Sequence, residues 1–277
     1  MVAPEARRAE RLIEVEKLVA RYGARTVLKG IDFDVRAGEI MVVMGGSGSG
    51  KSTLMRHLLA LERPSSGTVR VLGKDISRLC TLEQAELYRH VGVAFQSGAL
   101  FSSMSVGENI MLPLTEHTRL DQQTMEIMMR MKLEVVDLAG FEKLMPAELS
   151  GGMIKRAALA RAIVMDPAIL FCDEPSAGLD PVVSAQLDEL LLRLRGAMNM
   201  SIVVVTHELE SAFKIADRIT ILDRGEVLMV GTVDEIRASP HERIQSILNR
   251  RSEEETLNAD AYLQRLTGIE VETNPPL

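Results

Sequence analysis

Apolar and polar residues alternate along two segments near the start of the chain. Residues 12–20 and 31–35 place apolar side chains at every second position, a period that is typical of β-strands with one buried face. Gly23 lies between the two segments, where it suits a turn. The pattern therefore predicts an antiparallel pair of strands.

Later in the chain, short and continuous apolar runs replace this alternation. The runs at 41–44, 168–172 and 201–205 have the composition of strands that are buried on both faces of a sheet. Segments with helix-starting residues or helical spacing lie between them. Strands that alternate with helices predict an α/β fold. We expect further strands at 67–72, 90–95, 218–222 and 226–230, and helices at 81–89, 181–196, 208–215 and 232–238.

Residues 105–146 differ from the rest of the chain in their pattern of apolar and polar residues, which indicates a helical insertion. We expect a helix at 105–111, a loop that contains Pro113, and a second helix at 121–138. The second helix carries methionines that either fill irregular core gaps or line an adaptable partner surface. Both interpretations stay open for Met125, Met128, Met129 and Met131.

The last part of the chain, residues 241–277, is a charged extension beyond the final predicted strand and helix. Apolar residues at helical spacing indicate one helix that stops at Gly268. The extension either contacts a second subunit or accessory protein, or is simply solvated. The residues that carry the helical spacing are Leu257, Ala261, Leu263 and Leu266.

Composition and charge narrow the class of protein. The formal net charge of -7 over 277 residues argues against nucleic-acid binding through a broad basic surface. Without a run of about 18 apolar residues, the chain is expected to span no bilayer by itself, and its first residues do not resemble a secretory signal. Cys80 and Cys172 lack metal-ligand spacing. We expect both to be small core residues in a reducing compartment.

A glycine-rich stretch, residues 45–53, joins the apolar run at 41–44 to a helical segment. Its sequence GGSGSGKST fits the pattern G-x-x-x-x-G-K-[ST], in which backbone N–H groups surround a phosphate, the lysine reaches the outer phosphates and the last hydroxyl binds Mg²⁺. A chance match in a turn is the alternative, which the flanking strand and helix disfavour. We therefore predict a phosphate loop made of Gly45, Gly46, Ser47, Gly48, Ser49, Gly50, Lys51, Ser52 and Thr53.

Polar residues stand at the ends of three predicted strands. Gln96 ends the strand at 90–95, Asp173 and Glu174 follow the run at 168–172, and His207 comes after 201–205. Ligands of α/β sheets bind at such carboxyl ends. Two adjacent acids there are costly unless a cation lies near, and the phosphate loop would bring Mg²⁺ to them.

Two further features are less specific. Tyr22 precedes the turn at Gly23, where its ring either stacks on a nucleotide base or packs on the turn. Ser150, Gly151 and Gly152 open a helix, which either binds an anion at its positive end or is an ordinary capped helix.

Taken in order, Tyr22, GGSGSGKST, Gln96, LSGGM, ILFCDE, SAGLD and His207 resemble the motifs of the ATP-binding cassette (ABC) family of ATPases. The resemblance covers residues 11–240. It implies a P-loop NTPase fold with a RecA-like core, an antiparallel β subdomain and a helical subdomain at 105–165 that includes LSGGM.

The resemblance also implies ATP and Mg²⁺ as cofactors and ATP hydrolysis as the reaction. The metal would be organised by Ser52, Gln96 and Asp173, and adenine would stack on Tyr22. Four catalytic roles are implied: Lys51 holds the phosphates, Gln96 senses metal and water, Glu174 polarises the attacking water, and His207 contacts the γ-phosphate.

In this family the LSGGM segment serves the site of the opposite subunit. The resemblance therefore implies a homodimer in which Ser150, Gly151 and Gly152 complete the partner's site and Asp180 helps to couple the two sites. Met153 departs from the family, since most relatives carry glutamine there, and any contact of that amide is lost.

Two longer segments, LSGGMIKRAALARAI and QSGALFSSMSVGENIMLPLTEHTRL, resemble the ATPase subunits of MCE-type transporters, which move phospholipid between the bacterial inner and outer membranes. This resemblance implies a peripheral protein on the cytoplasmic face of the inner membrane, docked on an integral-membrane permease. An MCE-domain protein and a small STAS-domain accessory protein are further implied partners, and nucleic acid is not.

Three alternatives are weaker. An ABC ATPase for another cargo, such as an amino acid or a metal, shares every catalytic residue and differs only in these longer segments. A soluble ABC ATPase that acts on DNA or ribosomes usually has a long coiled coil or two cassettes, unlike this sequence. A P-loop kinase leaves Glu174, His207 and LSGGM unexplained.

Overall fold

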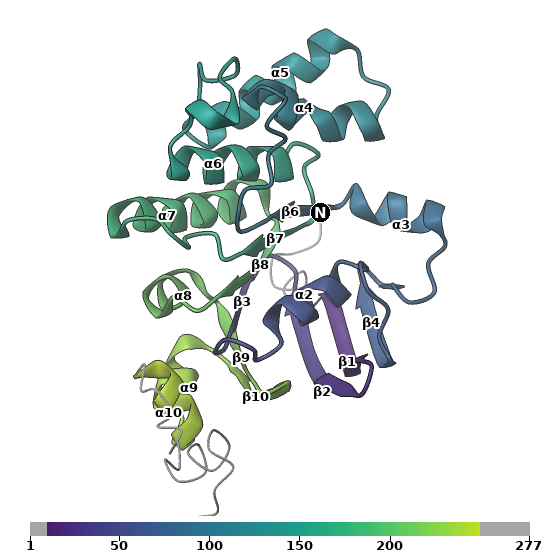
Figure 1. Cartoon of the computed structure of the whole chain (residues 1–277), viewed down its shortest axis with the longest axis vertical. Coiled ribbons are helices and arrows are strands. Elements are labelled where there is room, and N and C mark those ends of the chain that lie inside the picture. The colour runs from purple at the N-terminus through teal and green to yellow at the C-terminus, as the bar shows by residue number, and fades with distance from the viewer. Residues whose placement is uncertain (1–9, 250–277) are drawn as a thin grey trace, which may run out of the picture. The chain divides into compact units, whose positions relative to one another are not determined.

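The computed structural model describes residues 10–249, and within that range the chain has the predicted α/β fold (Figure 1). The strands of this range form two sheets. The contacts divide the chain into two compact units, with the boundary between Ala238 and Ser239. The helix expected near Leu257 lies outside the described residues.

The larger sheet has the strand order β10-β9-β3-β8-β7-β6. Neighbouring strands are parallel except for β10, which pairs antiparallel with β9. Every residue of β3 and β8 is buried, as the continuous apolar runs predict. The strands are β3 (Ile40–Met44), β6 (Val91–Ala94), β7 (Ile169–Asp173), β8 (Ser201–Thr206), β9 (Arg218–Asp223) and β10 (Glu226–Gly231).

The register of the parallel strands brings several chain segments to one edge of this sheet. Met44 is paired with Thr206, Asp173 with Val205, and Ala94 with Cys172. Because these strands run in the same direction, the residues that follow them all leave the sheet at its carboxyl edge.

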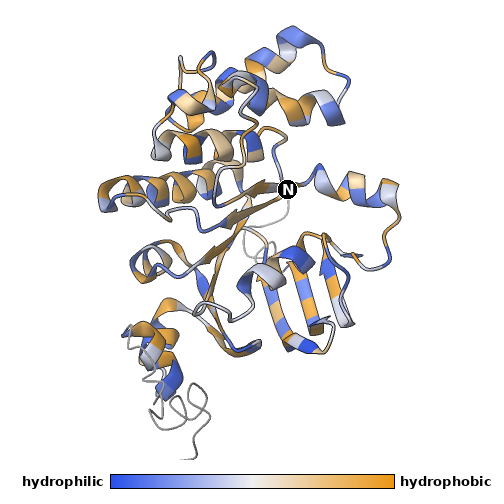
Figure 2. Cartoon of the chain, viewed as in Figure 1, coloured by the Kyte–Doolittle hydropathy of each residue, from blue (hydrophilic) through white to orange (hydrophobic). Residues whose placement is uncertain are grey.

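The smaller sheet is antiparallel, with the order β2-β1-β4-β5. Its strands are banded by alternating hydropathy (Figure 2), and their apolar faces share one core with β3 and with helix α2 (Lys51–Leu58). The predicted pair of strands is confirmed and is longer than expected. The strands are β1 (Arg11–Tyr22), β2 (Arg25–Arg36), β4 (Ser66–Val71) and β5 (Lys74–Asp75).

Helices α4 (Val106–His117), α5 (Gln122–Val135) and α6 (Gly151–Ala162) pack against one another (Figure 1). The expected loop at Pro113 is wrong, because α4 continues through it. A proline inside a helix costs about 3 kcal/mol. Burial of Ile110 and Leu114, both completely inaccessible, stabilises the helix by roughly 1.5–3 kcal/mol each and offsets that cost.

The remaining helices surround the larger sheet or follow it in the chain. They are α3 (Thr81–Tyr88), the 3-10 helix η1 (Pro146–Glu148), α7 (Pro181–Met198), α8 (Leu209–Ile215), α9 (Val233–Ala238) and α10 (Glu242–Leu248). Helix α10 was not predicted. Among the residues described, no helix has the length and apolar character needed to cross a membrane.

One of the two cysteines differs from expectation. Cys172 is buried in β7, as expected, whereas Cys80 is exposed. Cys80 stands at the N-cap of α3, where its backbone N–H donates to Glu83. The N-cap position of α3 is exposed, so the apolar character of the side chain did not decide its burial.

Candidate functional site

The phosphate loop, residues 45–53, connects the end of β3 to the start of α2. A Cβ atom on Gly45 would lie 2.1 Å from the carbonyl oxygen of Leu222, so only glycine fits this close approach. Gly50 has φ +107, a left-handed conformation that glycine adopts readily. The loop is also braced by the turn between β9 and β10, because Gly225 donates its N–H to the Ser49 carbonyl at 3.0 Å.

Lys51 lies folded over this loop. Its Nζ donates to the carbonyl oxygens of Gly45 at 2.8 Å and Gly46 at 3.0 Å. Burial lowers the pKa of the Lys51 ammonium, and the nearby charges of Glu174 and Asp173 oppose that shift. A half-buried cation beside a glycine-rich helix N-terminus has the chemistry to hold phosphate oxygens.

Asp173 and Glu174 leave the sheet at the end of β7, beside the loop. Burial raises the pKa of the Asp173 carboxyl, and the neighbouring Glu174 charge acts in the same direction while Lys51 opposes it. A bound divalent cation would relieve this cost of a buried charge. The Asp173 carboxylate and the Ser52 hydroxyl are oxygen donors of the kind that Mg²⁺ prefers, so the residues present fit that ion.

Within residues 10–249, no group of three or more His, Cys, Asp and Glu side chains is arranged to hold a metal ion. A magnesium ion at Asp173 would therefore take its remaining ligands from phosphate oxygens and water, which is its usual mode of binding beside nucleotides.

Glu174 is held by the end of β8. Its Oε2 accepts from the Thr206 hydroxyl at 3.1 Å and from the His207 N–H at 3.4 Å, and its Oε1 lies 2.8 Å from His207 Nδ1. The Glu174 side chain is 11% exposed, whereas that of His207 is 58% exposed. The structure thus brings together the predicted acid and histidine and directs the exposed imidazole toward solvent.

Gln96 follows β6, next to the end of β7. Its main-chain oxygen accepts a hydrogen bond from Lys155 Nζ, which also donates to the main-chain oxygen of Glu174. Lys155 was missed by the sequence analysis. The available signal was a lysine that shares the buried face of α6 with Ala158 and Leu159, three and four residues later.

Tyr22 stands at the end of β1, with 45% of its surface exposed. Its hydroxyl donates to Glu62, which also pairs with Arg56 of α2. Burial raises the pKa of the Tyr22 hydroxyl, and the hydrogen bond to Glu62 acts in the same direction. The half-exposed ring is therefore tied to α2 through Glu62. Stacking of adenine on it stays a prediction.

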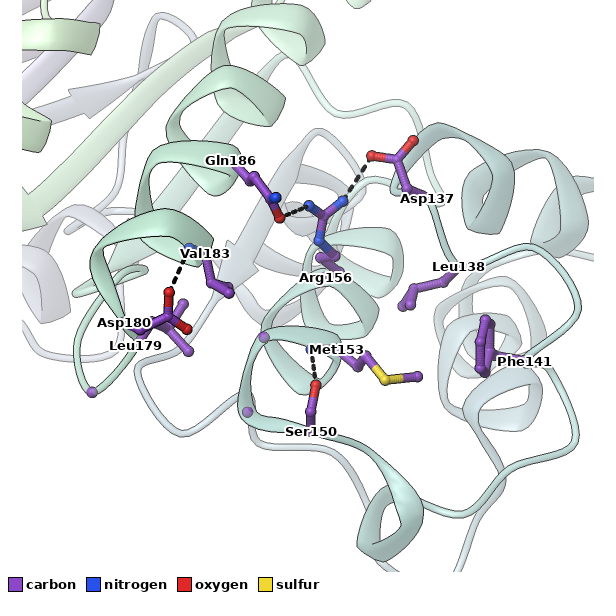
Figure 3. A pocket seen from close by; sticks show the side chains of 13 residues that line it. Asp137, Leu138, Phe141, Ser150, Met153, Arg156, Leu179, Asp180, Val183 and Gln186 are labelled. Carbon is purple, nitrogen blue, oxygen red and sulfur yellow. Dashed lines mark hydrogen bonds and ion pairs between the residues drawn. The ribbon is translucent and has the colours of Figure 1, made fainter.

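Ser150, Gly151 and Gly152 line a different cavity, of about 530 Å³, together with Asp180 (Figure 3). Ser150 caps α6 by accepting the N–H of Met153 at 3.3 Å. Asp180 caps α7 by accepting the N–H groups of Val182 and Val183 at 3.0 Å each. Of the described residues that line this cavity, none belongs to the phosphate loop. The structure therefore separates the predicted site residues into two sets.

Gly152 has a local structural role in addition to its predicted one. A Cβ atom there would lie 2.7 Å from Cγ1 of Val183, so glycine lets α6 begin close to α7. Met153 extends toward Phe141 on the other side of the same cavity (Figure 3). The thioether thus makes this wall of the cavity apolar, where an amide would make it polar.

An ionic network fixes α6 between its neighbours. Arg156 donates to Asp137 at 2.7 Å and to Gln186 of α7 at 3.4 Å (Figure 3). Arg193 of α7 donates to the same Asp137 oxygen at 2.7 Å. These contacts join α7 to the three-helix group, which consists of α4, α5 and α6.

Comparison with known proteins gives a consistent result. Residues 28–177 match the family model described as ABC transporter. The intermembrane phospholipid transport system ATP-binding protein MlaF of Haemophilus influenzae is 38% identical, over 88% of this chain and 92% of that protein. MlaF of Escherichia coli is 36% identical, over 86% and 88%. The probable ribonucleotide transport ATP-binding protein mkl of Mycobacterium leprae is 38% identical, over 86% and 69%.

Solved structures agree with these matches. The ATP-binding cassette MJ0796, in a dimeric post-hydrolysis state bound to ADP and Pi, is 28% identical with a TM-score of 0.73, over 80% of this chain and 98% of that one. The cbiO1 protein of Clostridium perfringens, part of the ABC transporter complex cbiONQ, is 27% identical with a TM-score of 0.77, over 92% and 99%.

Proposed function

The chain belongs to the ABC transporter family as an ATP-hydrolysing subunit, and we propose that it drives a permease that moves phospholipid between membranes. The proposal of phospholipid as the cargo rests on the similarity to MlaF, at 36–38% identity over at least 86% of this chain and 88% of the MlaF chains. Both matches extend beyond the ATPase motifs, which serve every cargo alike.

At the phosphate loop, the residues of this chain supply binding and charge. Backbone N–H groups and Lys51 hold the phosphates of ATP, and Tyr22 stacks on the adenine. Ser52 and Asp173 would hold Mg²⁺, and Gln96 would contact the metal and the water. When bound, the ion would supply positive charge beside the phosphate oxygens.

Glu174 orients and polarises the attacking water. Its partners Thr206 and His207 hold the carboxylate in place, and His207 turns to the γ-phosphate when ATP is bound. Because phosphoryl transfer depends mainly on positioning and charge stabilisation, both the negative charge of this acid and its exact placement should matter.

The signature residues Ser150, Gly151 and Gly152 complete the site of a second copy of the chain. Support comes from the separation of the two residue sets, because no residue of the phosphate loop lines the cavity at Ser150. We propose a homodimer with two composite sites, in which Asp180 lies beside the partner's nucleotide.

The partners proposed are an integral-membrane permease, an MCE-domain protein and a STAS-domain protein, with the chain on the cytoplasmic face of the inner membrane. Phe95 and Phe101, which flank Gln96 in sequence, are 41% and 53% exposed and offer apolar contacts for a permease. Co-expression with a neighbouring permease gene tests this proposal, because a chain that fractionates without the membrane contradicts it.

The test of cargo uses that complex in proteoliposomes. We expect ATP-dependent transfer of fluorescent phospholipid. We also expect the rate of ATP hydrolysis to depend on the phospholipid that is present. The mkl relative carries a ribonucleotide transport name, so ribonucleotides are the comparison cargo. Stimulation by ribonucleotides with no lipid transfer would contradict the proposal, although the ATPase assignment would remain.

A further inference from the structure

Lys155 is a buried lysine that bonds to main-chain oxygens instead of carboxylates. The residue is 9% exposed, and its Nζ donates to the carbonyl oxygens of Gln96 at 2.5 Å and Glu174 at 3.2 Å. Within residues 10–249, Lys155 forms no ion pair, because no carboxylate oxygen lies within 4.0 Å of its Nζ. Burying an ammonium is costly, so its position calls for a compensating role.

The two oxygens belong to the loops that carry the proposed catalytic residues. Gln96 and Glu174 follow adjacent parallel strands in equivalent positions, because Ala94 is paired with Cys172. Nothing in the sheet ladder fixes the chain beyond those paired residues on this side. Lys155 supplies the missing connection, with one donor group to each loop.

Glu174 needs such support because its backbone is strained. Its φ is +45, a left-handed conformation that is strained for a non-glycine residue. The peptide before it is held by the bond from Glu174 N–H to Val205 at 2.8 Å. The carbonyl after its Cα is held by Lys155. With both sides fixed, the carboxylate stays aimed at Thr206 and His207.

Lys155 also connects Glu174 to the LSGGM segment. Lys155 lies on α6, five residues after its N-cap Ser150, which is about 7.5 Å along a helix axis. A displacement of α6 therefore moves the donor that holds the Glu174 carbonyl. We propose that Lys155 is a positioning residue that sets Glu174 and the Gln96 loop for hydrolysis and couples them to α6. The inference rests on the proposed role of Glu174.

The test compares Lys155→Met with Lys155→Gln in the full-length protein. Methionine keeps the length and removes the donor, whereas glutamine keeps N–H donors without charge. We expect Lys155→Met to lower kcat by about 10- to 100-fold, as displaced catalytic groups do, while the Kd for ATP stays within about threefold. Lys155→Gln should recover kcat to within about fivefold of the wild type.

The matched control is Lys132→Met. Lys132 lies on α5, and its ion pair with Asp166 does not involve the carboxyl ends of the strands. This variant should keep the wild-type kcat. Melting temperatures are measured for all variants. The inference is overturned if Lys155→Met keeps kcat, if Lys155→Gln is as impaired as Lys155→Met, or if each loss of kcat merely follows the folded fraction.

The same assays separate this inference from the proposed function. A wild-type protein without ATPase activity, or Glu174→Gln with normal turnover, defeats the proposed roles in catalysis. An active wild type that depends on Glu174 but tolerates Lys155→Met defeats only the inference about Lys155.

Discussion

Glu174 shows how a single carboxylate is prepared by its surroundings. Three groups of β8 and the residue after it contact its two oxygens, and its main chain is fixed on both sides. A carboxylate held in this way would lose little mobility in its proposed role of orienting a water, which would favour catalysis through preorganisation.

Replacing Glu174 with glutamine should separate binding from hydrolysis. The amide keeps the shape and one acceptor oxygen, so we expect the Kd for ATP to change by less than about threefold. Without the negative charge the water is not polarised, and kcat should fall by about 100-fold or more. Phosphate release and nucleotide binding are measured on the same samples. Glu189→Gln, which alters an exposed ion pair with Lys214, serves as the control, and near-normal turnover of Glu174→Gln would contradict the assignment.

The two cysteines should differ sharply in reactivity. Burial raises the pKa of the Cys172 thiol from about 9 to about 12, so at pH 8 it is both neutral and inaccessible, while Cys80 is exposed. Because the thiolate is the reactive form, we expect a thiol reagent at pH 8 to label one site in the native chain and two in guanidinium, as counted by intact mass. Fast native labelling of Cys172 would show that β7 opens to solvent.

At this scale the sequence predicted residues whose chemistry is tied to a motif. It missed Lys155, because a lysine next to Arg156 reads as a solvated pair until the fold shows which face of α6 is buried. It also misplaced Cys80, since a small apolar side chain carries no information about which residue caps a helix.

Among the elements, α7 shows a residue with both a local and a proposed functional role. Asp180 satisfies two N–H groups at the start of this helix, and Pro181 occupies the first position, where a missing N–H costs nothing. The helix then carries Gln186 and Arg193 to Arg156 and Asp137. The segment SAGLD therefore sets the start of a helix that holds the three-helix group.

Asp180→Ala should destabilise the protein independently of nucleotide. Loss of an N-cap costs about 1 kcal/mol, which corresponds to a fall in Tm of roughly 2–4 °C for a domain of this size. Asp180→Asn keeps the acceptor oxygen and should change Tm by less than about 1 °C. Calorimetry without nucleotide measures both variants. An unchanged Tm in Asp180→Ala would mean that the cap contributes nothing in solution.

Element boundaries were predictable where one signal dominated. The continuous apolar runs and the turn at Gly225 gave the strands of the larger sheet, and Ser150 gave the start of α6. The end of α4 was not predictable, because local rules stop a helix at Pro113, whereas the burial of Ile110 and Leu114 depends on contacts with α5 and α6. Tertiary packing outweighed the local preference.

For the whole molecule, the sequence predicted the fold because an ordered set of motifs constrains it more tightly than any single pattern. The relation between the two residue sets required the structure. Ser150 lies on α6 and Lys51 on α2, and the cavity at Ser150 is lined by residues of α6, α7 and the segments before them. A chain with its phosphate loop in one place and its signature residues in another is suited to sharing sites with a second copy.

Mixing two inactive variants tests this sharing. Lys51→Ala should disable the phosphate loop, and Ser150→Arg should place a long cation where the partner's nucleotide binds, so each variant alone should lack hydrolysis. In a mixed dimer, one site combines the intact loop of one chain with the intact signature residues of the other, and the second site is defective in both parts.

We therefore expect the mixture, and neither variant alone, to hydrolyse one ATP per mixed dimer in a single-turnover experiment. Ser150→Arg should still bind ATP with nearly normal affinity as a monomer, because its own phosphate loop is unchanged. A control mixture of Lys51→Ala with Glu174→Gln should stay inactive, since both changes fall on the same half of a site and no intact combination forms. If the first mixture is as inactive as the control, each chain must complete its own site. If Ser150→Arg alone hydrolyses ATP, Ser150 contributes to no site. Either result would make the composite dimer wrong.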